Sequence, residues 1–271
     1  MATGEVSTEW SRRHLLIVLR VLVAVVLLLV AGLAYVAVRG TNSGTASAGL
    51  DSPDQKTWHV GADDVRGDAY RDAVAAEPML ETDDDDMRPA APALDEQRRM
   101  VIGPATKRGP AKVPSGFDHT PEGAVAQLAA IEVEALTPMS VGYARDVHLE
   151  WAMDGASFDR WGIAEAIQSF HTSAGTVDGD GGVSLTAKPV GAQIKGTDGP
   201  DWVLACVQLD VIVVVVEQVR FGYGYCERMQ WSGSRWMIAP GAPAAQAPST
   251  WPASKRSLDA GWRLWVDREA R

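Results

Sequence analysis

The two cysteines of this chain, Cys206 and Cys226, both lie in the stretch LACVQLDVIVVVVEQVRFGYGYC, one on each side of a valine-rich run. Two thiols so placed can remain free in a core, or they can form a disulfide. If the stretch folds as a hairpin about Val216, the two cysteines lie directly opposite each other on neighbouring strands. The same register places eight apolar side chains on one buried face: Val207, Leu209, Val211, Val213, Val219, Phe221, Tyr223 and Tyr225. Because a one-residue shift would break both features, we predict the disulfide, and with it a domain that folds outside the cytoplasm.

Other residues give little support for catalysis. The chain has no glycine-rich phosphate loop, no His-Glu-x-x-His, no Gly-x-Ser-x-Gly and no Cys-x-x-Cys. Of its five histidines, His148 and His171 could enter a cavity of the fold and form an acid–base pair with Asp146, Asp154 or Asp159. The spacing of these residues matches no catalytic motif. We therefore expect that the protein is not an enzyme and has no catalytic residue and no cofactor.

Two acidic segments could be mistaken for calcium sites. The run Asp83–Asp86 has no ligand spacing, and the segment DGDGG at 178–182 is not followed by the glutamate that closes a calcium loop. We therefore expect a solvated linker and a hairpin turn, respectively, and no metal site. The net charge of −10 also argues against direct binding to nucleic acid, which requires a basic surface.

An apolar segment near the N-terminus predicts a membrane anchor. Residues 15–38 are apolar apart from Arg20, and about 20 such residues suffice to cross the hydrocarbon core as a helix. Arg12, Arg13 and Arg20 flank its N-terminal side and Arg39 alone follows it. The positive-inside rule then places residues 1–14 in the cytoplasm and the rest of the chain outside. The alternative is a signal peptide cleaved after residue 48, so that the mature chain begins at Gly49.

Composition then divides the remainder into three parts. Residues 39–115 are poor in aliphatic side chains and rich in proline, small residues and acidic charge, which predicts a disordered tether. Within it, the stretch DDVRGDAYRDAVAAEPML could form a short helix. Residues 116–240 form the predicted extracytoplasmic domain, and residues 241–271 are a Pro-rich connector followed by a C-terminal helix.

The pattern of the extracytoplasmic domain predicts an α+β fold. Thr120 can cap a helix that begins at Pro121 and continues to Leu136, and a second helix is predicted over residues 158–170. After residue 182 the apolar period changes from helical spacing to two, which indicates a four-stranded antiparallel meander. In the C-terminal segment Ser257 could cap a helix carrying Trp262 and Trp265. These tryptophans could dock that helix on the sheet, or they could be exposed contacts for a partner.

The segments GFDHTPEGAVAQLAAIE, VLACVQLDV, CERMQWSGSRWMIAPG and STWPASKRSLDAGWRLW resemble uncharacterised membrane proteins of conjugative elements. The overall plan is similar to that of the bitopic assembly subunits of type IV secretion and conjugation machines. The resemblance implies a nuclear-transport-factor-2-like (cystatin-like) cone of helices on a curved sheet. It also implies a single-pass scaffold of the cell membrane that pairs with itself or with other secretion subunits. The alternatives are a cell-surface ligand-binding module and an accessory protein of envelope lipid transport.

Overall fold

A computed structural model of the chain describes residues 65–178 and 181–268. The predicted membrane helix, its arginine flanks and the possible cleavage site all lie outside these residues. Within the described ranges, no helix has both the length and the apolar character needed to cross a membrane. Everything described belongs to one of the two compact units of the chain, Trp58–Arg271.

A six-stranded sheet organises the described unit, with the strand order β1-β8-β4-β5-β6-β7. The last four of these strands form the predicted antiparallel meander. Strand β8 pairs antiparallel with β4, whereas β1 pairs parallel with β8, so the sheet is mixed and the prediction of a wholly antiparallel sheet is wrong. The strand bounds are β1 Arg99–Ile102, β4 Ser184–Thr197, β5 Trp202–Val214, β6 Gln218–Trp231, β7 Trp236–Ile238 and β8 Arg263–Asp267.

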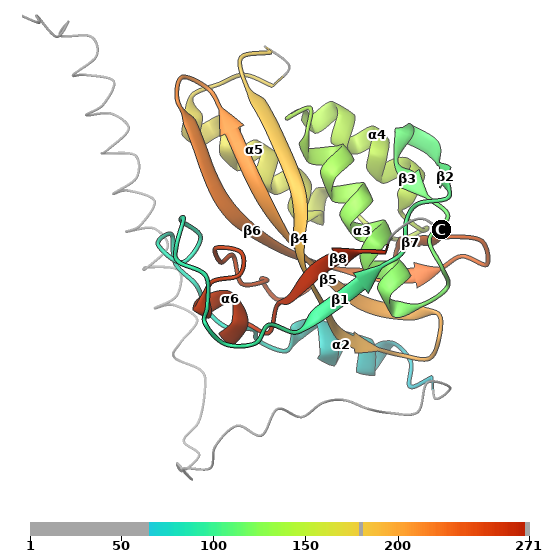
Figure 1. Ribbon diagram of the computed structural model, residues 1–271. Coiled ribbons are helices and arrows are strands. Elements are labelled where there is room, and N and C mark those ends of the chain that lie inside the picture. Colours follow the sequence, from blue (N-terminus) through green and yellow to red (C-terminus); the bar gives the residue numbers. More distant parts are fainter. Residues whose placement is uncertain (1–64, 179–180, 269–271) are drawn as a thin grey trace, which may run out of the picture. The chain divides into compact units, whose positions relative to one another are not determined.

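Three helices pack on one face of this sheet, which confirms the α+β class (Figure 1). Helix α3, Pro121–Leu136, begins as predicted, because the Thr120 hydroxyl accepts a hydrogen bond from the Gly123 amide at 3.1 Å. Helix α4, Val141–Trp151, lies between the two predicted helices in the sequence, and its N-cap Ser140 accepts a hydrogen bond from the Tyr143 amide. Helix α5, Gly162–Ala174, starts later than predicted, because a short 3₁₀ turn, η2 Phe158–Arg160, precedes it.

The hairpin register is the predicted one. Cys206 pairs with Cys226, and the two form a disulfide. Val207, Leu209, Val211 and Val213 are buried beneath the helices, as expected. The prediction is wrong at Val219, which is 54% exposed, because it lies beside the hairpin tip.

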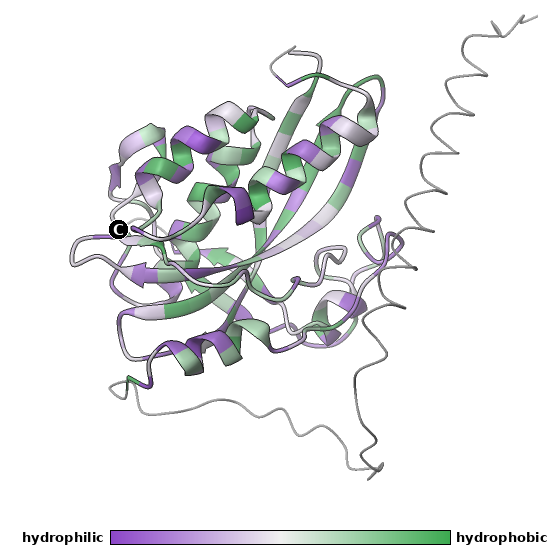
Figure 2. Cartoon of the chain, turned by 180° about the vertical axis from the view of Figure 1, so that it is seen from behind, coloured by the Kyte–Doolittle hydropathy of each residue, from purple (hydrophilic) through white to green (hydrophobic). Residues whose placement is uncertain are grey.

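The prediction of a disordered tether is wrong for residues 65–115. This segment forms helix α2, Asp68–Ala76, strand β1, the two-residue strands β2, Lys107–Arg108, and β3, Pro114–Ser115, and the 3₁₀ turn η1, Pro110–Lys112. Val74 and Ala75 of α2 are buried against Trp202 and Leu204 on the sheet face opposite the three large helices. The few apolar residues of the segment therefore cover part of the second sheet face. Hydrophobic residues lie along much of the long strands (Figure 2). The predicted disorder of residues 39–64 lies outside the described residues.

A buried carboxylate anchors the start of this segment. Asp198, in the turn between β4 and β5, accepts hydrogen bonds from the backbone amides of Arg66 and Gly67 and from the Arg71 guanidinium, the last at 2.6 Å. Burial alone would raise the pKa of Asp198, but these hydrogen bonds outweigh it and lower the pKa below its usual value. Asp198 therefore holds α2 against the sheet as a carboxylate.

The predicted long C-terminal helix is also wrong. Only Lys255–Asp259, α6, is helical, and Ser254 caps it in place of Ser257. The chain then turns at Gly261, whose φ of 84° favours glycine, and continues as β8. Trp262 is buried and donates from its indole nitrogen to the Pro248 carbonyl at 3.1 Å.

The connector that precedes α6 passes closely over β6. A Cβ atom on Gly222 would lie 1.9 Å from the Thr250 carbonyl oxygen, and one on Gly224 would lie 2.4 Å from that of Pro248. The two glycines of the FGYGYC sequence are therefore the positions that allow the connector to lie on the strand.

Candidate functional site

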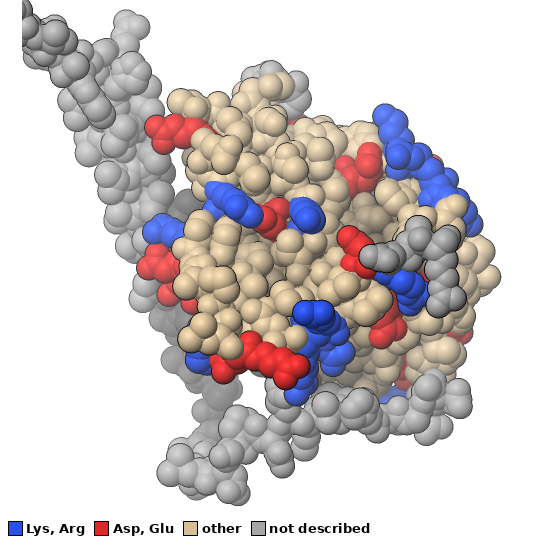
Figure 3. Space-filling model, viewed as in Figure 1, with Lys and Arg blue, Asp and Glu red and all other residues tan. Residues whose placement is uncertain are grey.

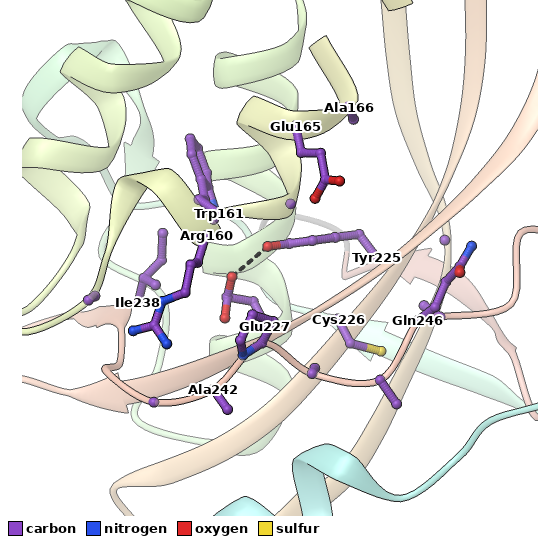
Figure 4. A pocket seen from close by; sticks show the side chains of 18 of the residues that line it. Arg160, Trp161, Glu165, Ala166, Tyr225, Cys226, Glu227, Ile238, Ala242 and Gln246 are labelled. Carbon is purple, nitrogen blue, oxygen red and sulfur yellow. Dashed lines mark hydrogen bonds between the residues drawn. The ribbon is translucent and has the colours of Figure 1, made fainter. Parts of the chain in front are cut away.

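A cavity of about 430 Å³ lies between the start of α5, the middle of β6 and the connector after β7 (Figure 4). Strand β7 pairs only with the last residues of β6, Met229–Trp231. The preceding part of β6 therefore has a strand partner on one side only, and the cavity lies beside it. The side chains that give the cavity its chemical character are His148, Arg160, Trp161, Glu165, Tyr225 and Glu227.

The alternation of β6 sends Tyr223, Tyr225 and Glu227 to one face of the strand and Cys226 to the other. Helix α5 comes close to Tyr225 because it begins with glycine, since a Cβ on Gly162 would lie 2.8 Å from the tyrosine ring. The tight packing of α5 against β6 therefore depends on a residue without a side chain.

Glu227 and Tyr225 form a hydrogen-bonded pair in the cavity. The Tyr225 hydroxyl donates to one carboxylate oxygen of Glu227 at 2.5 Å, and the Arg228 amide donates to the other at 2.9 Å. Burial raises the pKa of Glu227, although these hydrogen bonds and the Arg228 charge oppose the shift. Burial and the neighbouring Glu227 also raise the pKa of Tyr225, which keeps its hydroxyl protonated as a donor.

A second buried carboxyl group approaches from α3. Glu132 is fully buried, and neither of its carboxylate oxygens has a hydrogen-bond partner among the described residues. Burial, and then the nearby Glu227, raise the pKa of Glu132 well above the usual value. Two carboxyl groups that cannot easily ionise together therefore lie at the interface of α3 and β6.

The predicted histidine–aspartate pairs are not assembled in the described structure. His148 does line the cavity, packed beside Trp161 and Phe158, and burial followed by the charge of Arg145 lowers its pKa, so the ring is held neutral. His171 lies elsewhere, with ring nitrogens 2.8 Å from the Thr176 hydroxyl and 2.7 Å from the Met139 carbonyl.

The carboxylates that line the cavity are glutamates, and the proposed aspartate partners, Asp146, Asp154 and Asp159, are not in its lining. Over the two described ranges, no group of three or more potential metal-ligating side chains comes together. The Asp83–Asp86 run forms a local turn, in which Asp83 accepts from the amides of Asp85 and Asp86.

The other predicted site residues have structural positions. Cys206 and Cys226 form a small buried cluster with Trp262 on the second face of the sheet, and Met79 packs against it. Trp262 is buried, which contradicts an exposed partner contact at this residue, but it follows α6 and so docks no helix. Trp265 is half-buried on β8 and donates to its neighbour Asp267 at 2.7 Å. The arginines proposed as anchor flanks, Arg12, Arg13, Arg20 and Arg39, lie outside the described residues.

Sequence reasoning missed Glu132, Glu165 and Glu227. One signal was present for Glu227, because the predicted register places it on the same strand face as Tyr225. Glu132 also falls in the run AAIEVEAL, which is apolar apart from Glu132 and Glu134, and a carboxylate on the sheet-facing side of a helix is unusual.

Comparison of the chain with models of protein families, with curated proteins and with solved structures finds no match. The site must therefore be interpreted from its own chemistry. It offers carboxylate oxygens, aromatic faces and one tryptophan N–H, an arrangement that can bind a small polar molecule or transfer a proton.

Proposed function

We propose that this chain is a membrane-anchored scaffold subunit of a conjugative transfer or type IV secretion apparatus, which acts outside the cytoplasm through protein–protein contacts. The observation that carries the proposal is the Cys206–Cys226 disulfide, in a domain that follows an apolar segment long enough to span a membrane. Disulfides persist in oxidising compartments, so this bond supports an extracytoplasmic location.

The order of elements supports the finer fold assignment within this proposal. Three helices are followed by an antiparallel meander that they cover on one face, as expected for a nuclear-transport-factor-2-like cone. The parallel strand β1, the strand β8 and the segment that covers the second face are additions to that plan. The proposal also includes a single-pass membrane anchor with the described domain outside and the N-terminus in the cytoplasm.

The exposed surface suggests where partners bind. The tip of the β5–β6 hairpin exposes Val215, Val216 and Val219, with Val216 91% exposed, and α4 exposes Leu149 at 71%. Acidic and basic side chains are interspersed on the face shown in Figure 3, with no large patch of one sign. Apolar side chains at the hairpin tip are therefore the best candidates for contacts with a second subunit.

Site-specific photo-cross-linking in the native membrane tests this proposal. A photoreactive residue replaces Val216 in one variant and Leu149 in another, and exposed Ser234 in the β6–β7 turn provides the control position. We expect channel subunits, a secretion ATPase or a second copy of the chain to attach at Val216 or Leu149 but not at Ser234. Attachment of lipid-transport proteins, or normal DNA transfer after deletion of the chain, would contradict the scaffold function.

A second candidate function is that of a cell-surface ligand-binding module. It is favoured by one observation, the cavity beside β6, whose volume falls within the range of about 300–1,000 Å³ found for small-molecule sites. Native mass spectrometry of the protein purified from its own membrane tests it. A bound small molecule supports this function, and its loss when the cavity is blocked by Ser169→Trp locates the site.

A further inference from the structure

Two buried polar groups, one in the cavity wall and one near it, have no partner within the described protein. Trp161 is only 3% exposed and lines the cavity, yet its indole N–H has no acceptor within the described part of the chain. The carboxyl group of Glu132 is not in the cavity lining, but it lies near Tyr223, whose pKa is raised by burial and then by Glu132, and it is likewise without a partner among the described residues. Unpartnered groups at this depth are costly in a closed core, and they indicate a region adapted to polar contents.

Two acidic side chains lie on the cavity side of α5 and β6. Glu227 is 8% exposed and forms part of the wall, and Glu165 points toward Tyr225 from α5 at the exposed mouth (Figure 4). The buried cation Arg228 is not part of the cavity lining. It donates to the Ala242 carbonyl and forms an ion pair with Asp72 at 2.8 Å, although its Nη2 makes no hydrogen bond among the described residues. Among the lining residues, this leaves Arg160, exposed at the mouth, as the cation that opposes the two glutamates.

Much of the rest of the wall is aromatic and apolar, and its other polar side chains are Ser157, Ser169, Gln246 and Ser249. Trp161, Tyr225 and Ile238 line the cavity together with His148, whose ring is neutral. A carboxylate beside aromatic faces is an arrangement that binds ammonium ions, because the charge meets the carboxylate and the ring faces attract the cation. It favours an anion much less, since an anionic group would lie next to Glu227 with no free buried cation to offset it.

We propose that this cavity binds a small organic ammonium ion, with its charged group between Glu227 and Glu165 and its apolar part against Trp161. The inference specifies the second candidate function above and rests on it. The ligand class follows from the acidic groups and the aromatic rings of the cavity.

Proton linkage predicts the direction in which ligand affinity changes with pH. Several titratable or charged groups surround Glu227. They are Tyr225 and Arg228 on its own strand, Glu132 from α3, Arg160 and Glu165 from η2 and α5, and His148 from α4. An ammonium ion at this position favours the ionised form of Glu227, so binding releases a proton wherever the raised pKa leaves the free carboxyl group protonated. Affinity should therefore increase as pH rises through the titration of Glu227, whereas an anionic ligand would show the opposite trend.

Calorimetric titration of the intact protein with three probes of similar shape tests the proposal. The probes are benzylammonium, benzyl alcohol and benzoate, which differ in charge at one end. We expect benzylammonium to bind at least tenfold more tightly than benzyl alcohol, and benzoate not to bind. The Glu227→Gln variant should weaken benzylammonium binding at least tenfold, and Glu165→Gln, at the exposed mouth, two- to fivefold.

The matched control is Glu217→Gln, which removes the same charge from an exposed position beside the β5–β6 hairpin tip and should leave affinity unchanged. If Glu227→Gln fails to fold, Glu165→Gln still decides, because its exposed side chain can be replaced without loss of packing. Equal or tighter binding of benzoate or benzyl alcohol would overturn the ammonium proposal and leave the ligand-binding function standing. Absence of benzylammonium binding overturns the proposal as well, and native mass spectrometry then decides the ligand-binding function separately.

Discussion

Removal of the Cys206–Cys226 disulfide should destabilise the domain by a predictable amount. The two residues are 20 positions apart in the sequence, and both are buried, with 0% and 5% of their surface exposed. In the chain-entropy model, closing a loop of this length restricts the unfolded chain by about 3 kcal/mol. Alanine at both positions removes little apolar volume, so most of the expected loss comes from that restriction.

Thermal unfolding of the intact protein, followed by tryptophan fluorescence, measures this loss. For a domain of this size each kcal/mol corresponds to roughly 2–4 °C, so the Cys206→Ala/Cys226→Ala variant should melt roughly 6–12 °C below the oxidised wild type. The control is reduction, since dithiothreitol should lower the melting temperature of the wild type and leave that of the double variant unchanged.

Two results would refute this reasoning. The first is a double variant that melts within about 1 °C of the oxidised wild type, which would mean that the bond restricts the unfolded chain very little. The second is rapid labelling of both cysteines in native, unreduced protein, which would show two free thiols. The second result would also remove the observation that carries the proposed extracytoplasmic location.

Three further substitutions test other parts of the structure. Glu132→Leu should stabilise the protein by roughly 1–3 kcal/mol, measured by urea unfolding. Because the pKa of Glu132 is raised in the folded state, the free energy of unfolding of the wild type falls as pH rises above the usual pKa of 4.5. The stability gain of the variant should therefore grow over that range. Gly222→Ala should cost roughly 2–3 kcal/mol in the same assay, because its Cβ would collide with the connector backbone, whereas Gly182→Ala, with nothing within 4 Å, should be neutral. Asp198→Ala should release α2 and make the bond after Arg66 sensitive to trypsin, and unchanged cleavage would contradict the anchoring role given to this carboxylate.

Local sequence signals were sufficient for the central part of the fold. The period-two pattern on both sides of Val216 and the two cysteines specify one register, and the observed pairing is that register. The start of α3 was predictable for a similar reason, since a cap at Thr120 and proline at the next position act within a single turn. Both predictions depend on residues that are close in sequence or opposed in one hairpin.

Long-range contacts explain the two main errors. The segment after Val65 has too few apolar residues to fold alone, but the Asp198 carboxylate, more than 120 positions away, accepts hydrogen bonds from its backbone and from Arg71. At the C-terminus, the spacing of Trp262 and Trp265 fits a helix, yet Gly261 ends α6 and Trp262 is buried against the Pro-rich connector. Neither partner can be identified from the local pattern.

The candidate site was hidden for the same reason. Glu132 and Glu227 are separated by 95 positions, and their proximity depends on how α3 packs on β6. An isolated glutamate in a helix or strand is normally a solvated residue. Only the tertiary structure distinguishes these two, because it shows that both are buried and that one has no hydrogen-bond partner among the described residues.

The disulfide and the cavity are linked through one short stretch of β6. Cys226 lies between Tyr225 and Glu227, and β7 does not extend far enough to pair with any of them, so β5 is their strand neighbour on one side only. The disulfide ties this stretch to β5 and thereby fixes the position of the Glu227 carboxylate. We therefore expect mild reduction to weaken benzylammonium binding before the tryptophan fluorescence reports unfolding. If binding and folding are instead lost together, the bond stabilises the whole domain and has no separate effect on the cavity.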